Sequence, residues 1–183
     1  MNSGKMVFAQ LMEFAPYHVF KYCVKRYNGD YKVQNFTCWR QFLCMSFGQL
    51  THRESLSDTT LCLKLQQDKL YHLGIGKPFH KSTISRANET RDWRIYRDFA
   101  LKLIEQAKIL YSGVNQLDLN LKGAIYALDS SVVDLCITTF WWATYRTTKS
   151  AIKMHTLLDL KTAIPEYIFI TEGSVHDVRI LDR

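Results

Sequence analysis

The spacing of apolar residues changes its period between Tyr111 and Gly123, and this change constrains the fold more than any other feature. Before it, apolar residues recur every three or four positions, as on one side of a helix. After it come short runs of β-branched and aromatic residues separated by Gly and Pro, which are typical of strands. The sequence therefore predicts an α+β protein with a helical domain at residues 1–111, a linker at 112–122 and a strand-rich domain at 123–183.

Several segments of the first domain have helical character. In residues 55–73, Ser55 is the expected N-cap and Gly74 the expected stop, with Leu61, Leu65 and Leu70 along one side. The other helical segments are residues 37–50, 82–89 and 91–111, and in the last of these Trp93, Tyr96, Phe99, Leu103 and Ile104 are expected to point inward.

A turn is expected at "GIGKPFHKS", residues 74–82, because it contains two glycines and a proline. A helix, a glycine-containing turn and a short helix rich in Ser, Thr, Arg and Asn form the outline of a helix-turn-helix DNA reader. An ordinary helical bundle with a basic rim has the same outline, so both interpretations stay open. The side chains that would face DNA are Lys77, His80, Lys81, Ser82, Thr83, Ser85, Arg86, Asn88 and Arg91.

The net positive charge of the chain lies entirely in its first part. Residues 1–111 hold 17 Lys and Arg against 9 Asp and Glu, whereas residues 112–183 hold 7 against 8. This asymmetry indicates a nucleic-acid-binding segment beside a different kind of domain. A solvated basic surface without a partner is the alternative.

The composition argues against membrane and secreted classes. No apolar stretch is long enough to span a membrane, and the first residues lack the apolar core and cleavage site of a signal peptide. The five cysteines form no C-x-x-C pair, which argues against a zinc site or a disulfide framework. We therefore expect a cytoplasmic protein with reduced thiols.

The first predicted strand, "AIYALDSSVVDLC", carries Asp129 near its centre. In a buried strand an ionised carboxylate is costly unless it is paired or binds a metal. Asp129 is therefore either a satisfied core group or part of a metal site. Asp134 lies five residues further on, so in a regular strand its side chain points to the opposite face.

The motifs "LDSSVVDLC", "WWATYRTTKS", "IKMHTLLDL" and "VHDV", in this order, closely resemble bacterial insertion-sequence transposases with a DDE catalytic domain. Upstream, "FTCWRQFLCMSFGQL", "YHLGIGK" and "STISRANETRDWRIY" resemble the helical domain of the same group. The resemblance implies a helix-turn-helix-like domain followed by an incomplete ribonuclease H-like α/β domain, with its first three strands and the start of its first helix. It also implies a nucleoid-associated bacterial protein, a possible homo-oligomer, acting on double-stranded DNA at terminal inverted repeats and target sites.

In that family two aspartates and a glutamate hold two Mg²⁺ (or Mn²⁺) ions for DNA cleavage and strand transfer. Asp129 matches the first aspartate and is the expected catalytic metal ligand. Asp177 follows the third strand, where its expected role is to interact with a helix N-terminus, and metal binding by Asp177 is the less favoured alternative. The other two acids are absent from the sequence. We therefore expect a truncated, inactive transposase that does not bind Mg²⁺ stably.

Two other functions compete with that of a transposase. A non-catalytic DNA-binding protein would occupy the element ends and regulate the intact enzyme. A metal-dependent nuclease unrelated to transposition is the third hypothesis, although a separate helical domain argues against it. The basic residues Arg146, Lys149 and Lys153 would reach DNA near the active centre or would simply be solvated. The strand that carries Asp129 is expected at an open apolar sheet edge, which predicts that the second domain on its own is poorly folded or self-associates.

Overall fold

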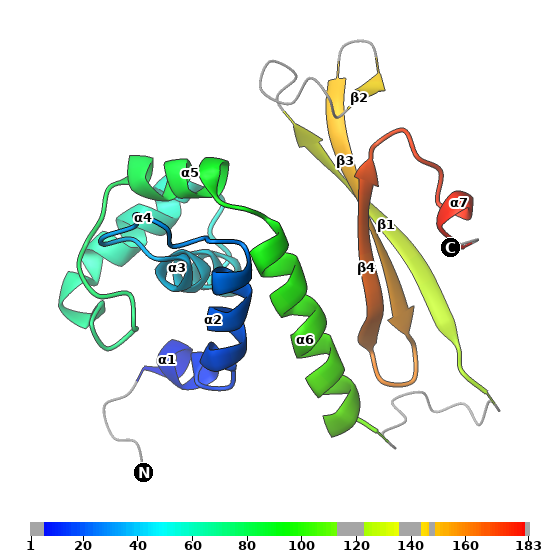
Figure 1. Cartoon of the computed structure of the whole chain (residues 1–183), viewed down its shortest axis with the longest axis horizontal. Helices are drawn as coiled ribbons and strands as arrows, with labels where there is room; N and C mark the ends of the chain where they lie inside the picture. Colours follow the sequence, from blue (N-terminus) through cyan, green and yellow to red (C-terminus); the bar gives the residue numbers. More distant parts are fainter. Residues whose placement is uncertain (1–5, 113–122, 136–143, 147–148, 182–183) are drawn as a thin grey trace. The chain divides into compact units, whose positions relative to one another are not determined.

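The computed structural model of the protein describes residues 6–112, 123–135, 144–146 and 149–181 (Figure 1). The chain divides into two compact units, residues 1–99 and residues 100–183. Helices form the first unit and an antiparallel sheet dominates the second, which confirms the predicted α+β class. The boundary between the units falls inside one long helix. Of the predicted linker at 112–122, only Ser112 is described.

Short helices joined by turns build the first unit. In chain order they are α1 (Val7–Met12), α2 (Tyr17–Arg26), α3 (Cys38–Leu50), α4 (Leu56–Leu65), the 3-10 turn η1 (Gln67–Lys69) and α5 (Lys81–Thr90), followed by α6 (Arg94–Leu110). Side-chain hydroxyls cap two of them: Thr37 accepts from the N–H of Arg40, and Ser55 accepts from the N–H of Asp58. Such caps satisfy backbone donors that the start of a helix leaves free. The Ser55 cap confirms the predicted start of α4.

Aromatic rings hold α2, α3 and α6 together. Phe20 of α2 and Phe99 of α6 are both buried, and their rings meet edge-on with centroids 5.0 Å apart. Phe42 of α3 packs against both of these rings. Nearby, burial raises the pKa of the Cys44 thiol to about 12, so this thiol stays protonated at neutral pH. Packed aromatic rings therefore join these three helices in the core of the first unit.

The helix predicted at residues 55–73 is shorter than its pattern suggested. α4 ends at Leu65, and η1 and further turns follow. Leu61 and Leu65 are exposed, whereas Leu63 and Leu70 are buried. The helical spacing of Leu61, Leu65 and Leu70 assumed one continuous helix, but the helix ends at Leu65. Leu61 and Leu65 therefore lie on the exposed side of α4, although Leu70 is buried.

Trp93 also differs from its prediction. It lies just before α6 and is 55% exposed, while Ile95 takes the buried position two residues later. Phe99 is buried as predicted, and Tyr96 is half-buried.

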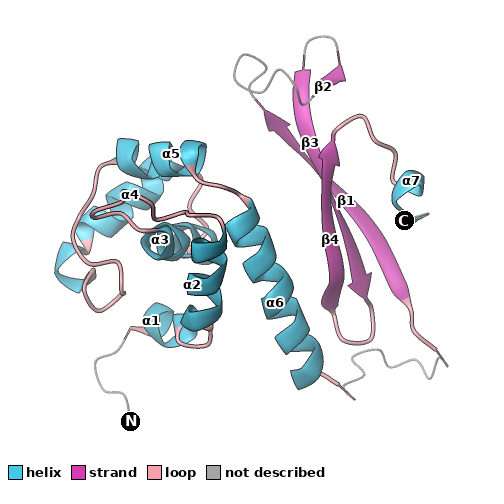
Figure 2. Ribbon diagram, viewed as in Figure 1, coloured by secondary structure: helices cyan, strands magenta, loops and turns pink. Residues whose placement is uncertain are grey.

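The second unit is an antiparallel sheet followed by a one-turn helix (Figure 2). Its elements are β1 (Tyr126–Leu135), β2 (Thr144–Arg146), β3 (Lys149–Asp159), β4 (Ile164–Glu172) and α7 (Val178–Leu181). β3 is central: β1 pairs along one of its edges, while β4 and the short β2 pair along the other. The three long strands and the start of a helix lie where the sequence predicts them. β2 was not predicted.

The register of β1 against β3 assigns side chains to the two faces of the sheet. Asp129 pairs with Thr156 and Ser130 pairs with His155, without a register shift along β1. Neighbours in a strand point to opposite faces, and paired residues point to the same face. Asp129 and Thr156 therefore lie on one face, and Ser130 and His155 lie on the other. In the described part of the chain β1 pairs with β3 alone, so the other edge of β1 is unpaired, as the sequence predicts.

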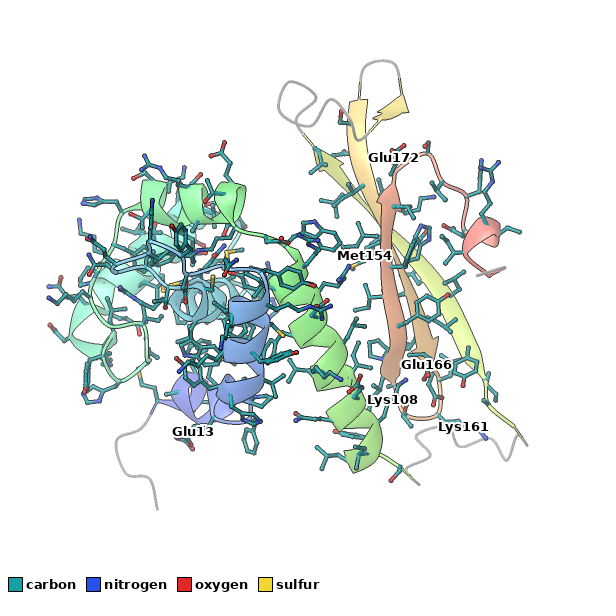
Figure 3. All side chains as sticks on the ribbon, in the orientation of Figure 1. Glu13, Lys108, Met154, Lys161, Glu166 and Glu172 are labelled. Carbon is teal, nitrogen blue, oxygen red and sulfur yellow. The ribbon has the colours of Figure 1, made fainter. Side chains whose placement is uncertain are left out.

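Residues 100–110 of α6 belong to the same unit as the sheet. The Lys108 Nζ lies 2.6 Å from Oε1 of Glu166 on β4 and donates to the backbone carbonyl of that residue at 3.3 Å (Figure 3). Both side chains are partly exposed, so the pair adds at most about 1 kcal/mol. With 17 residues α6 is the longest described helix, and none of the described helices is long and apolar enough to cross a bilayer.

Candidate nucleic-acid interface and the Asp129 strand

A buried polar network fixes α5 to α3 and α6. Gln41 of α3 is 4% exposed, and its Nε2 donates to Oδ1 of Asn88 at 2.5 Å. Its Oε1 accepts from the guanidinium of Arg91 at 2.6 Å and from the hydroxyl of Tyr96 at 2.7 Å. A buried amide with these partners specifies one arrangement of the elements around it. The orientation of α5 is therefore set by long-range side-chain contacts.

Arg91 is occupied inside the first unit. Its guanidinium also donates to the carbonyl oxygens of Phe36 and Thr37, and it lies over the Phe36 ring at 5.6 Å from the centroid. Asn88, besides its bond with Gln41, donates to the sulfur of Met45. Arg91 and Asn88 were both predicted to face DNA, and in the structure both belong to the network that holds α5 in place, although Asn88 is also exposed and Arg91 is half-buried.

The connection from α4 to α5, residues 66–80, is longer than the three or four residues of a helix-turn-helix. Arg40 of α3 holds its last part, because its guanidinium donates to the carbonyl oxygen of Lys77 at 2.6 Å and to that of Asn35. Gly76 adopts a φ of +80°, which a residue with a Cβ reaches only with strain. The backbone just before α5 is thus fixed by α3, while the Lys77 side chain is left exposed.

The other side chains predicted to face DNA lie at the surface. His80, Lys81, Ser82, Ser85 and Arg86 are exposed, and Thr83 is half-buried. Within the described residues, no hydrogen bond or ion pair engages the side chains of Lys77, Lys81 or Arg86. We call the set Lys77, Lys81, Ser82, Ser85 and Arg86 the α5 surface. It is a positive surface without an internal partner.

A cleft of about 530 Å³ adjoins the α5 surface within the first unit. Tyr27, Tyr31 and Phe36 line it from one side, and Ser82 and Arg86 line it from α5. Aromatic rings, hydroxyl groups and a free guanidinium are groups that contact bases, sugars and phosphates. Ser82 and Arg86 therefore belong to both the cleft and the α5 surface.

Glu89 belongs to the outward side of α5 and was not predicted as part of it. It is exposed and follows Arg86 by three positions, so the two side chains are neighbours on the helix. Among the described residues its carboxylate has no ion pair. An acid at helical spacing from Arg86 was the sequence signal that could have identified it.

Asp129 lies in the middle of β1, as predicted, but β1 is not a buried strand. Asp129 is exposed, and so are Val132 and Val133, at 45% and 47%. No hydrogen bond or ion pair to the Asp129 carboxylate occurs within the described part of the chain. The structure therefore contradicts the interpretation of Asp129 as a satisfied core acid.

Asp177 is bound on the other face of the sheet. Its Oδ2 accepts from the hydroxyl of Ser130 at 3.0 Å, and its Oδ1 lies 3.4 Å from Nζ of Lys153 and 3.2 Å from Nδ1 of His155. Burial works against ionisation, but the Ser130 hydrogen bond and the charge of Lys153 outweigh it and lower the pKa of the Asp177 carboxyl. Asp177 immediately precedes α7, so these contacts anchor the start of α7 to the sheet.

The described residues do not form a site for two Mg²⁺ or Mn²⁺ ions. Such a site needs several carboxylates converging on one place, and no group of three His, Cys, Asp or Glu side chains converges in the described part of the chain. Asp129 and Asp177 lie on opposite faces of β1. Lys153 is bound to Asp177 and to the carbonyl of Val175, away from Asp129. The side chains of Arg146 and Lys149 lie outside the described set.

The helical part of the chain has a counterpart among known protein families. Residues 3–76 match a family described as a domain of unknown function (DUF4372), which occurs at the N-terminus of some transposase-like proteins. No curated protein and no solved structure matches the chain. The matched region contains α1 to α4 and η1 and ends before α5.

Proposed function

We propose that this chain binds double-stranded DNA through the α5 surface and acts at the ends of a mobile DNA element, as transposases of the DDE class do. The free cations of the α5 surface carry this proposal. The match of residues 3–76 to a domain found in front of some transposase-like proteins supports it. The order of three antiparallel strands and a helix, with Asp129 on the first strand, agrees with a ribonuclease H-like beginning.

The free cations are informative because other cations of the same region are engaged internally. Arg40 and Arg91 both donate to backbone carbonyl oxygens. Lys77, Lys81 and Arg86 have no such partner in the described structure, and they lie just before and along one exposed helix. DNA phosphates accept charge-assisted hydrogen bonds from these groups and release counterions on binding. In the proposed complex α5 lies in a groove with Lys77 and Lys81 on the flanking phosphates.

Binding without cleavage is the second candidate function for these 183 residues, and the position of Asp177 favours it. A single carboxylate cannot hold two divalent ions, and Asp177 is bound on the face opposite Asp129. Under this alternative the chain occupies DNA ends and competes there with an active enzyme. The two candidates share the α5 surface and differ in whether further acids complete a site around Asp129.

The test is fluorescence anisotropy with a labelled duplex of about 20 base pairs, two turns of DNA, over a salt series from about 50 to 200 mM. The chain 1–183 is compared with Lys81→Ala and with Lys21→Ala. Lys21 is an exposed lysine on α2 without a partner among the described residues, so both variants lose one positive charge. Lys81→Ala should weaken binding at low salt and reduce the slope of log K against log salt by about 0.9.

Lys21→Ala should leave both the affinity and the salt slope close to those of the unmodified chain. Absence of salt-sensitive binding by the unmodified chain would refute the proposal. Equal effects of the two substitutions would show that binding is non-specific attraction to a basic protein and does not use the α5 surface.

A further inference from the structure

Four outward residues of α5 have the spacing with which a single helix reads a DNA groove. Ser85, Arg86 and Glu89 follow Ser82 by three, four and seven positions, and all four are exposed. Residues at these intervals form one stripe along a helix. The recognition helix of homeodomains reads the major groove with a stripe of the same spacing. The opposite side of α5 is buried, so this stripe is the side available to DNA.

The acid in this stripe conflicts with a surface that contacts only phosphates. Phosphates repel Glu89, and in the described structure Arg86 does not neutralise it by an ion pair. A carboxylate becomes favourable in the major groove when it accepts a hydrogen bond from a base, and Glu pairs there with the N4 amine of cytosine. Arg86 has the complementary preference, because a guanidinium binds O6 and N7 of guanine through two hydrogen bonds.

The distances along α5 fit neighbouring base pairs. Residues three apart in an α-helix are separated by about 4.5 Å along its axis, and successive base pairs by about 3.4 Å. Arg86 and Glu89 can therefore reach adjacent base pairs when α5 lies along the groove. The stripe from Ser82 to Glu89 covers about 10.5 Å, which corresponds to about three base pairs.

We infer that Arg86 and Glu89 determine the DNA sequence that α5 recognises, Arg86 by binding a guanine and Glu89 by accepting from a cytosine in a neighbouring base pair. Ser82 and Ser85 supplement these contacts with hydroxyl hydrogen bonds, while Lys77 and Lys81 bind phosphates. This inference rests on the proposed DNA binding by the α5 surface and adds the bases that are read.

The experiment is selection of bound duplexes from a pool with about ten randomised base pairs, one turn of DNA, followed by sequencing. The chain 1–183 is compared with Arg86→Ala, Glu89→Gln and Glu54→Gln. Glu54 is exposed and lies outside α5, so Glu54→Gln removes the same charge as Glu89→Gln without touching the stripe. Circular dichroism confirms that each variant keeps its helix content.

The unmodified chain should select a motif of about three base pairs that includes adjacent guanine and cytosine preferences. Glu89→Gln should replace the cytosine preference by adenine, whose N6 and N7 pair with an amide, and should bind unselected DNA more tightly. Arg86→Ala should lose the guanine preference and bind the selected motif about tenfold more weakly. Glu54→Gln should select the original motif.

The outcomes separate this inference from the function on which it rests. If the unmodified chain retains no duplex, DNA binding itself is refuted. If it retains all sequences equally, or if Glu89→Gln and Arg86→Ala both select the original motif, DNA binding stands and the assignment of Arg86 and Glu89 is overturned.

Discussion

The hydroxyl of Ser130 donates a hydrogen bond to the carboxylate of Asp177 at 3.0 Å. Ser130 directly follows Asp129 in the regular strand β1, so the side chains of these two residues point to opposite faces. The bond therefore places Asp177 on the face that Asp129 does not share. Of these two acids of the second unit, Asp129 has no partner among the described residues, whereas Asp177 contacts Ser130, Lys153 and His155.

We predict that Asp177→Asn weakens the attachment of α7 at neutral pH. The folded-state pKa of Asp177 is below its ordinary value of 3.8, so the carboxylate stabilises the fold above that value and the effect is lost as pH falls through the folded pKa. Urea denaturation should give a lower midpoint for the variant at pH 7, and the difference should shrink below pH 3.8.

Asp134→Asn is the matched control, because Asp134 is an exposed acid of β1 without a partner among the described residues. It should leave the midpoint unchanged at pH 7. A difference between Asp177→Asn and the unmodified chain that is the same at every pH would contradict the assigned role.

His155→Ala should destabilise the second unit by about 2–4 kcal/mol. The His155 side chain is fully buried, its Nε2 lies 2.9 Å from the Thr171 hydroxyl and its Nδ1 lies against Asp177. The substitution leaves a cavity and removes partners from both neighbours. Met154→Ala changes the adjacent, 37% exposed residue and should cost less than about 1 kcal/mol. Chemical denaturation followed by circular dichroism measures both values, and equal losses would refute the prediction.

Features that depend on neighbouring residues were predictable from the sequence. The start of α4 at Ser55 follows from a hydroxyl cap, and α3 follows from a continuous helical pattern after Thr37. The three long strands follow from runs of β-branched and aromatic residues bounded by Gly and Pro. Each of these signals acts within one segment, so the rest of the fold does not alter it.

Features that depend on distant contacts were not predictable. In the sequence Arg91 resembles any other arginine after a polar helix. Its hydrogen bonds are made to Phe36 and Gln41, which lie more than forty positions away in the chain. The exposure of Asp129 depends on which strands flank β1, because a β-rich run is buried in the middle of a sheet and exposed at its edge. The spacing of apolar residues along the sequence reveals neither the distant partners of Arg91 nor the strands that lie beside β1.

Arg91→Ala should destabilise the first unit by about 2–4 kcal/mol, because charge-assisted hydrogen bonds to Thr37, Phe36 and Gln41 are lost and their acceptors are left unsatisfied. Arg86→Ala removes the same side chain from the same region but should change stability by less than about 0.5 kcal/mol, since Arg86 is exposed and free. Thermal and urea denaturation of both variants test whether Arg91 is structural and whether Arg86, which we propose to contact DNA, is dispensable for folding. A destabilising Arg86→Ala would overturn it.

Gly29→Ala should destabilise the first unit by about 1–3 kcal/mol. A Cβ at this position would collide with the Cδ1 of Ile95 and lie 2.8 Å from the Sγ of Cys38. Both of these residues are fully buried, so neither can move into solvent to make room. A lower urea midpoint is expected, and enlarging the space with Ile95→Val should recover part of the loss when combined with Gly29→Ala. Stability equal to that of the unmodified chain would show that Gly29, in the turn after α2, is packed less tightly against Ile95 and Cys38 than in the structure.

Asp129→Asn should leave both the stability and the DNA affinity of residues 1–183 within about 0.5 kcal/mol of the unmodified values. The reason is that Asp129 is exposed, has no partner in the described residues and lies in the unit that does not contain α5. With Mg²⁺ added, neither protein should nick supercoiled plasmid DNA, since one carboxylate does not assemble a two-ion site. Nicking by the unmodified chain that Asp129→Asn abolishes would mean that these 183 residues supply the missing ligands after all, and binding without cleavage would then be excluded.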